Sequence, residues 1–430
     1  MFSNLHIIIQ IVLLIVCTIS LCKTRQSIDV NDDDRYHCLC RTDNPVNIEL
    51  SVNKSIDLLK QHMSHHMIPG LAFGVSRYGR HIVNEPIGWA DLENNVPIYR
   101  DSEWRLASIS KSITSALVAR LIEDNRLNLN DSIYKYLKPG VFPRKQWKGR
   151  EVDITLGQLM SHTGGTRVTK ILDDSANVYE YTNVTESIAQ FSHEPLISAP
   201  GTQYNYSNFG WQLVGAVIES ITGENFNDTI NKFVRDIHMP STYAETYEML
   251  VRHRVHDYIK SDSEYLLHPT KNKSELHIMN AMLYDDLLAM EAQWPCGALM
   301  STVDNLLTFS DFMLDSYNNV NHTKPDLLKS ETIKQLWKPI IDAYSDDFGT
   351  HKQAHGWLIN DLKNPIQCTN KCQMPSTIKR VIWKSGGLTG LTTIIMIFPE
   401  QHICVTLLTN NSDFDEFYES ALIIGKLFMM

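Results

Sequence analysis

Ser108-Ile109-Ser110-Lys111 opens an apolar pattern of helical spacing, and this stretch decides how the whole chain is interpreted. The apolar residues that follow lie on one face of a helix: Ile113, Ala116, Leu117, Leu121 and Ile122. Ser108 is therefore expected near a helix N-terminus, where open N–H groups and the macrodipole favour developing negative charge. Lys111, one turn on, lies within reach of the hydroxyl. The pattern is weak by itself, because Ser-x-x-Lys also begins at Ser20, Ser51, Ser132 and Ser376.

A second string, Tyr206-Ser207-Asn208, follows Pro200-Gly201 and precedes another apolar helical pattern. A phenol beside ammonium groups can be held as phenolate or can transfer a proton. The Asn208 amide offers both a donor and an acceptor, which suits it to orient Lys111 and a substrate amide. Taken alone, such a string is typical of an ordinary turn.

A third string, Lys384-Ser385-Gly386-Gly387, leads into an expected strand at 392–398. Lys384 would add positive potential facing Ser108, and the two glycines permit close approach of a substrate backbone. The N–H groups of Ser108 and Gly387 would form an oxyanion hole for a tetrahedral intermediate. Since a serine hydroxyl needs a base to become nucleophilic, the three strings together predict an acyl-transfer centre.

The chain resembles the serine β-lactamase/penicillin-binding-protein superfamily, in its class C β-lactamase and esterase branch, because the three strings occur in that order. Further matching strings include Gly88-Trp-Ala-Asp-Leu-Glu-Asn94 and Leu159-Met-Ser-His-Thr-Gly164. Within the branch, the likeness is greatest to the animal serine β-lactamase-like proteins and spans about residues 50–428. It implies an α/β (α+β) fold with a five-stranded antiparallel sheet flanked by helices, an inserted all-helical lobe, and the site in the cleft.

The resemblance also implies a role for each site residue. Ser108 would be the acylated nucleophile, Lys111 its proton acceptor, and Tyr206 a proton shuttle that also helps deacylation. The residues expected to orient the substrate and hold its anionic group are Asn208, Lys384, Ser385 and Gly386. No cofactor is implied.

Two positions depart from the family pattern. Lys384 stands where many relatives carry His, and Cys296 stands where a small Ala or Gly is usual. His162, in Ser-His-Thr-Gly, is interpreted as structural. No metal is expected, because His62, His65 and His66 lack the His-Glu-x-x-His pattern.

Periodicity predicts that the sheet is built from both ends of the chain. Strands are expected at 71–76, 81–83, 392–398 and 403–408, and helices at 55–67, 212–221, 303–313 and 415–429. A helical lobe inserted between the two ends is the economical topology. We therefore expect a β-lactamase-like domain over residues 46–430, with a sheet lobe at about 46–107 and 340–430 and a helical lobe at about 108–339.

The composition is that of an ordinary soluble globular protein. The 430 residues are 43% hydrophobic and 20% charged, with a formal net charge of −10. That charge argues against nucleic-acid binding, which normally needs a basic face. The expected partner is a peptide or ester substrate, and the family likeness adds a homo-oligomer or filament.

The first 22 residues read as a signal peptide or signal anchor, followed by a flexible linker at 23–45. An uncleaved leader would tether the chain to a membrane through residues 5–22. The glycosylation sequons favour a secreted or secretory-pathway protein: Asn53, Asn130, Asn183, Asn205, Asn227, Asn272, Asn321 and Asn410. The family likeness offers a mitochondrial location as the alternative. Six cysteines outside the leader allow fifteen disulfide pairings.

These observations predict a serine hydrolase that forms a covalent acyl-enzyme, foremost a peptidase acting on amide bonds. An esterase or lipase and a true β-lactamase are the alternatives within the same fold. A catalytically silent binding or filament-forming scaffold is the alternative from another class.

Overall fold

The computed structural model describes residues 47–167, 181–246, 249–260, 278–280, 293–319, 327–362, 367–368, 372–373, 378–412, 414 and 416–429. Asn47–Met429 forms one compact unit. The expected signal peptide and linker lie outside the described residues. Among the described residues, no helix is both long and apolar enough to cross a bilayer.

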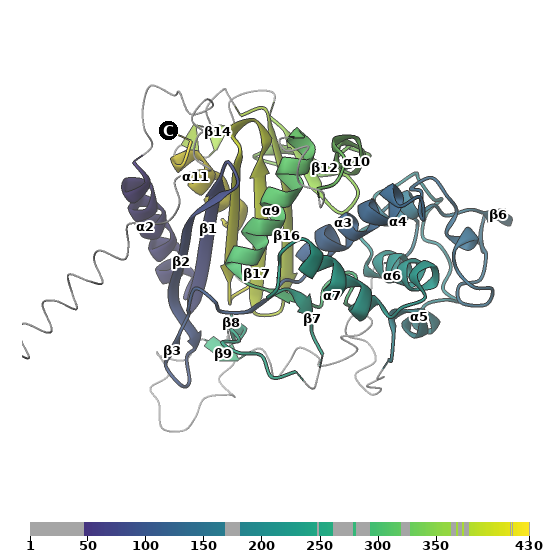
Figure 1. Ribbon diagram of the computed structural model, residues 1–430, viewed down its shortest axis with the longest axis horizontal. Coiled ribbons are helices and arrows are strands. Elements are labelled where there is room, and N and C mark those ends of the chain that lie inside the picture. The colour runs from purple at the N-terminus through teal and green to yellow at the C-terminus, as the bar shows by residue number, and fades with distance from the viewer. Residues whose placement is uncertain are drawn as a thin grey trace, which may run out of the picture. The chain divides into compact units, whose positions relative to one another are not determined.

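A nine-stranded antiparallel sheet occupies the centre of this unit (Figure 1), in the order β11-β12-β13-β16-β17-β18-β1-β2-β3. The strands are β1 (Gly70–Arg77), β2 (Arg80–Asp91), β3 (Val96–Pro97), β11 (Ile341–Asp346), β12 (Gly349–Gln353), β13 (Leu358–Asp361), β16 (Arg380–Leu388), β17 (Leu391–Phe398) and β18 (Ile403–Thr409). The predicted fold class is confirmed. The number of strands is corrected from five to nine, because β3 pairs with β2 at one edge and β11, β12 and β13 extend the sheet beyond β16 at the other.

The central strands of the sheet are apolar on both faces, because helices cover both. In β17, Ile394, Met396 and Phe398 point into one hydrophobic core, and Ile395 and Ile397 point into the other. The first core lies under α2 (Ile48–His66) and α11 (Phe417–Leu427), and the second under α3 (Ile109–Glu123) and α9 (Val303–Asn318). Strands that are covered on both sides read as near-continuous apolar runs.

The middle of the chain is mainly helical, but it is not the all-helical lobe that was expected, because it also contains short strands. Its helices are α4 (Leu156–Met160), α5 (Val184–Ser187), α6 (Asn208–Thr222), α7 (Phe226–Asp236) and, further along, α10 (Ser330–Leu336). Its short strands are β4 (Trp104–Arg105), β5 (Lys145–Trp147), β6 (Arg150–Val152), β7 (Tyr243–Ala244), β8 (Tyr258–Lys260), β9 (Ile278–Asn280) and β10 (Leu299–Ser301). A small hairpin, β14 (Gln367–Cys368) with β15 (Cys372–Gln373), completes the strands.

The structure excludes two of the cysteines from disulfides and one of the sequons from glycosylation. Cys296 and Cys404 are buried free thiols, so neither belongs to a disulfide framework. The Asn410 sequon is closed, because its Oδ1 accepts from the Gly70 N–H at 2.8 Å and its Nδ2 donates to the Trp89 carbonyl at 2.9 Å. A glycan on this buried amide would break both hydrogen bonds.

Candidate active site

Ser108 lies at the turn that leads from β4 into α3, and its side chain is half-buried. The residue before it, Ala107, has a φ of +47°, a left-handed backbone conformation that residues other than glycine rarely adopt. The Leu106 N–H donates to the Leu299 carbonyl at 2.9 Å and ties this turn to β10. The turn therefore presents the hydroxyl at the start of a helix.

Lys111 lies one turn further along α3 and is completely buried. Its Nζ donates to Ser108 Oγ at 3.0 Å and to the Cys296 carbonyl oxygen at 2.7 Å. A buried ammonium is costly unless it is hydrogen-bonded, so these two contacts fix where it lies. Burial also raises the pKa of the Cys296 thiol to about 11, which keeps that side chain protonated beside the lysine.

Hydroxyl groups on α3 hold the walls around Lys111 in place. Thr114 Oγ1 donates to the Pro295 carbonyl at 3.0 Å, which positions the next residue, Cys296, under the ammonium. Ser112 Oγ donates to the Gly356 carbonyl at 2.8 Å on the opposite side. The Ser and Thr residues between the apolar positions of this helix therefore anchor it to two loops.

Tyr206 lies just before α6, whose N-cap is Ser207. Its hydroxyl oxygen is 2.6 Å from Ser108 Oγ. The Nζ atoms of Lys111 and Lys384 lie 4.9 and 5.3 Å from the centre of its ring. Two ammonium groups from different parts of the chain therefore converge on one phenol.

Lys384 reaches this site because of its position in β16. It shares a face of the sheet with Ile382, whose side chain packs into the core on the α3 side. Its side chain is buried, and this burial together with the Lys111 charge lowers the pKa of Lys384 to about 8, although Tyr206 opposes the shift.

The electrostatics of the site favour the charged form of the phenol. Burial by itself raises the pKa of Tyr206, but the charges of Lys111 and Lys384 and the hydrogen bonds from Lys111 and Ser108 outweigh it. The result is a pKa of about 8 for Tyr206, against 10.0 for an ordinary tyrosine. A group with this pKa exchanges protons readily near neutral pH.

His162, interpreted from the sequence as structural, packs directly on Tyr206. The two rings stack with centres 4.2 Å apart and an interplanar angle of 27°. The Ser207 N–H donates to His162 Nδ1 at 3.0 Å, so the ring proton is on Nε2. Burial and the nearby Lys384 and Lys111 charges hold the pKa of His162 well below its usual value, so the ring is neutral.

Gly386 brings β16 against the Ser108 turn. A Cβ at this position would lie 2.8 Å from the Ser108 nitrogen and 2.3 Å from the Leu106 carbonyl oxygen, so no larger residue fits. The next residue, Gly387, is exposed and has open space around it. Among the described residues, β13 stops pairing with β16 at Trp383, so the segment after it pairs with β17 alone.

Two predicted residues have looser placements. Asn208 is the first residue of α6, and its buried Oδ1 has no hydrogen-bond partner within the described ranges. The hydrogen bonds of Lys111 instead go to Ser108 and Cys296. Ser385, which neighbours Lys384 on β16, is half-buried.

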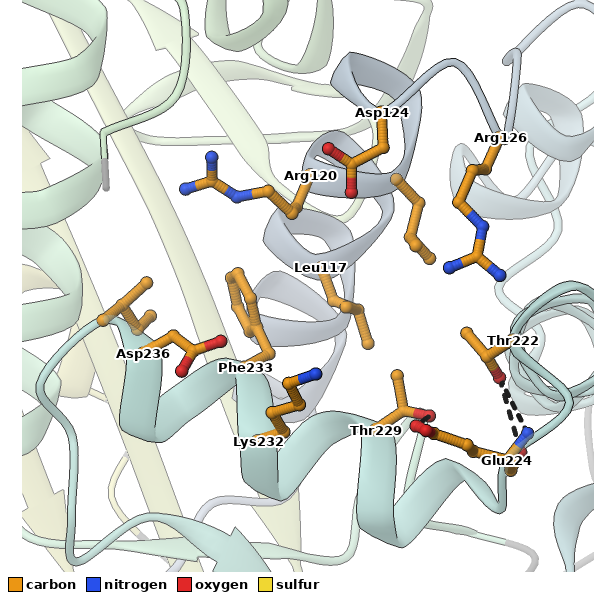
Figure 2. A pocket seen from close by; sticks show the side chains of 12 residues that line it. Leu117, Arg120, Asp124, Arg126, Thr222, Glu224, Thr229, Lys232, Phe233 and Asp236 are labelled. Carbon is orange, nitrogen blue, oxygen red and sulfur yellow. Dashed lines mark hydrogen bonds between the residues drawn. The ribbon is translucent and has the colours of Figure 1, made fainter. Parts of the chain in front are cut away.

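A second hollow lies at the other end of α3. It has a volume of about 400 Å³ and lies between the C-terminal half of α3, the end of α6 and α7 (Figure 2). Leu117 and Phe233 form its apolar part, and Arg126 and Lys232 stand at its rim with acidic neighbours. Because Ser108 is at the opposite end of α3, this hollow is not part of the candidate active site.

Three contacts were not predicted. They are the hydrogen bond from Lys111 to the Cys296 carbonyl, the stacking of His162 on Tyr206, and the approach of Gly386 to the Ser108 turn. The Cys296 carbonyl belongs to the main chain, so no residue type in the sequence indicates this contact. The stacking of His162 and the contact at Gly386 depend on segments far apart in the chain. Only the strings at 108–111, 206–208 and 384–387 carried a signal that could be read in advance.

Comparison with known proteins gives the family. The chain belongs to the Beta-lactamase family, whose family model matches residues 56–425. Human serine beta-lactamase-like protein LACTB, mitochondrial, is 25% identical over 420 residues, which cover 82% of this chain and 72% of the relative.

Solved structures share the fold. The octameric penicillin-binding protein homologue from Pyrococcus abyssi has a TM-score of 0.69 and 19% identity, covering 86% of this chain and 76% of its own. EstCE1, a hydrolase with promiscuous acyltransferase activity, has a TM-score of 0.69 and 17% identity, covering 90% of this chain and 100% of its own. These likenesses show the fold.

Proposed function

We propose that this protein is a serine hydrolase that forms a covalent acyl-enzyme at Ser108 and acts as a peptidase on amide bonds. One observation carries the proposal: Ser108 Oγ contacts both Tyr206 Oη, at 2.6 Å, and Lys111 Nζ, at 3.0 Å. A serine hydroxyl with a proton acceptor on one side and a cationic group on the other has what a covalent acyl-transfer mechanism needs.

Tyr206 and Lys111 are the two groups that can take the serine proton. The shorter contact and the lowered pKa favour the Tyr206 phenolate, which amounts to about one tenth of the molecules at pH 7. As Oγ forms its bond to the substrate carbonyl carbon, its proton passes to the phenolate and then to the leaving nitrogen. In hydrolysis of the acyl-enzyme, the same phenolate takes a proton from the attacking water and returns it to Ser108 Oγ as the bond from Oγ to the acyl carbon breaks, while Lys111 stabilises the negative charge.

The remaining predicted residues surround the substrate in this proposal. The N–H groups of Ser108 and Gly387 stabilise the tetrahedral oxyanion, where preorganised donors contribute most. Gly386 lets these two segments approach. Lys384 and Ser385 bind an anionic group of the substrate, and Asn208 orients its amide.

The open segment of β16 favours a peptide over a small ester. Between Lys384 and Leu388, this strand pairs with β17 on one side, and β13 does not cover its other side among the described residues. An extended peptide can add to such an edge through main-chain hydrogen bonds. An ester lacks the N–H groups that this pairing uses.

Labelling with a fluorescent fluorophosphonate tests the nucleophile. We expect one adduct, mapped by mass spectrometry to Ser108, and loss of both labelling and hydrolysis in Ser108→Ala. Ser132→Ala is the matched control, because Ser132 also begins a Ser-x-x-Lys string but donates to Asp153, while Lys135 pairs with Asp131. Labelling elsewhere, or an active Ser108→Ala variant, would refute the proposal.

A substrate panel then separates the activities of the fold. Matched peptides, acyl esters and β-lactams are compared by kcat/KM, and the peptidase proposal requires the peptides to be the best substrates. Higher values for esters or for β-lactams would identify an esterase or a β-lactamase. A folded protein that neither labels nor turns over any of them would be a scaffold.

The cellular location is a separate proposal. The matching human protein is named as mitochondrial, which favours that alternative over secretion for this chain. Fractionation of the cells that express it, with mass spectrometry of the mature N-terminus, distinguishes the two: cleavage near residue 22 with glycosylated exposed sequons would establish the secretory route.

A further inference from the structure

Three potential metal ligands meet where the first described helix packs near the last. His62 and His66 lie one turn apart on α2, and Glu416 lies just before α11. Each offers one ligand atom, and the three atoms all lie within 4.8 Å of one another. No metal was predicted here from the sequence, because the carboxylate comes from a distant part of the chain.

The closest pair in this group is already in contact. His66 Nε2 lies 2.7 Å from Glu416 Oε2. Both atoms are inaccessible to solvent. At this distance the two side chains form an ion pair, and the same two atoms become available to a metal ion when they separate slightly.

The surroundings hold the two imidazoles in place. The Phe414 ring packs against His62 and His66, with centres 5.0 and 5.5 Å apart. Ser51 Oγ donates to the Leu427 carbonyl at 2.7 Å and ties α2 to the end of α11. Ligands that neighbouring groups orient in advance lose less entropy when they bind a metal.

We propose that His62, His66 and Glu416 bind one Zn²⁺ ion, with water as the fourth ligand. Two imidazoles and one carboxylate are a ligand set that suits zinc. Zinc ligands lie about 2.0–2.1 Å from the ion, so tetrahedral ligand atoms are roughly 3.3 Å apart and the His66–Glu416 contact opens slightly on binding. The ion would join α2 and α11 on the face of the sheet that α3 does not cover.

Zinc binding by the full-length protein, purified without a polyhistidine tag and stripped with a chelator, tests the proposal. After equilibration with micromolar Zn²⁺ and gel filtration, we expect one tightly held equivalent per chain by elemental mass spectrometry. The melting temperature should rise by several degrees, since an ion that binds only the folded state stabilises it. Co²⁺ in place of Zn²⁺ should give the visible absorption of a tetrahedral complex.

Variants decide whether this cluster is responsible, because the chain has 17 histidines and imidazole is a common zinc ligand. His62→Asn and His66→Asn should each weaken zinc binding at least tenfold, whereas the exposed neighbour variant His65→Asn should bind as the wild type does. Glu416→Gln, which keeps the size of the side chain, decides the matter if a histidine variant fails to fold. Wild-type protein without a tight equivalent, or variants that retain it, would overturn the proposal.

Discussion

Tyr206 is the residue on which the chemistry of the site depends, because it combines contact with Ser108 and a lowered pKa. Its ring is held by His162 on one face and lies close to two ammonium groups. The stacking fixes the position of the phenol, and the two charges lower its pKa. Its neighbour Lys384 has a pKa of about 8 as well, so the two groups titrate in the same range.

Replacing Tyr206 by phenylalanine tests the proton transfer. Phenylalanine keeps the stacking on His162 and removes only the hydroxyl, so the fold should persist by circular dichroism. Loss of a general acid–base group typically costs about 10²–10⁴-fold in rate, and we expect a fall in kcat/KM in that range. A variant that retains wild-type kcat/KM would show that Lys111 alone takes the proton.

The pH dependence provides an independent check. As the pH rises towards 8, Tyr206 loses its proton and kcat/KM should increase; above 8, Lys384 loses its charge and kcat/KM should decrease. In Lys384→Met, the pKa of Tyr206 should rise because one stabilising charge is lost, and the ascending limb should move to higher pH. Measurement on an uncharged substrate isolates this effect, and an unmoved limb would contradict it.

At this scale, residue type predicted which side chains meet at the candidate site but not the groups that hold them. Ser108, Lys111, Tyr206 and Lys384 carry unusual chemistry in recognisable strings. The stacking of His162 has no such mark, since a histidine in a loop has many uses.

Among the elements, the contact between β16 and the Ser108 turn matters most. This contact depends on Gly386, because only hydrogen fits between the strand, the Ser108 nitrogen and the Leu106 carbonyl. The contact also brings Gly387 near the start of α3, where the proposed oxyanion hole would form. The Thr393 hydroxyl donates to the Leu106 carbonyl at 2.9 Å and reinforces the same junction from β17.

Gly386→Ala should therefore separate the strand from the turn. We expect a loss of about 1–3 kcal/mol in the free energy of unfolding, as for other overpacked sites. A displacement of about 1 Å at a reacting group can cost about 10²-fold, so kcat/KM should fall by that order. Gly387→Ala is the control for stability, because its Cβ meets no atom within 4 Å, and its melting temperature should match the wild type. Equal stability of both variants would contradict the packing argument.

The elements with strong periodicity were predicted and those without it were not. The expected helix at 55–67 and strands at 392–398 and 403–408 correspond to α2, β17 and β18, because their apolar spacing reflects burial on the sheet. The β11–β12 hairpin was missed because β11 is largely exposed and polar. A largely exposed edge strand lacks the apolar pattern by which a strand is predicted.

At the scale of the whole molecule, the two ends of the chain meet in the centre of the sheet. The last strand, β18, pairs with β17 on one side and with β1 on the other. Sequence reasoning anticipated that both ends supply the sheet, because each end carried strand-like patterns. It could not supply the order of the strands or their number.

A chain that ends after residue 402 should be unable to fold. It lacks α11 and all of β18, whose seven residues are buried. Each buried apolar side chain stabilises by about 1.5–3 kcal/mol, and several such losses equal the whole stability of a typical protein, about 5–15 kcal/mol. We expect no cooperative unfolding transition by circular dichroism. A chain that begins at Asn47 should keep its transition, because Asn47–Met429 is a unit of its own; a cooperative transition in the first chain, or its loss in the second, would contradict this topology.

The central place of the last strand also bears on how the protein is made. During translation β1 emerges early, but its partner β18 follows only after more than three hundred further residues, which at usual synthesis rates takes tens of seconds. Throughout that time the nascent chain exposes an apolar strand edge, which is the kind of surface that aggregates. Cells that express this protein in quantity should therefore depend on ribosome-associated chaperones to prevent aggregation of the nascent chain until synthesis is complete.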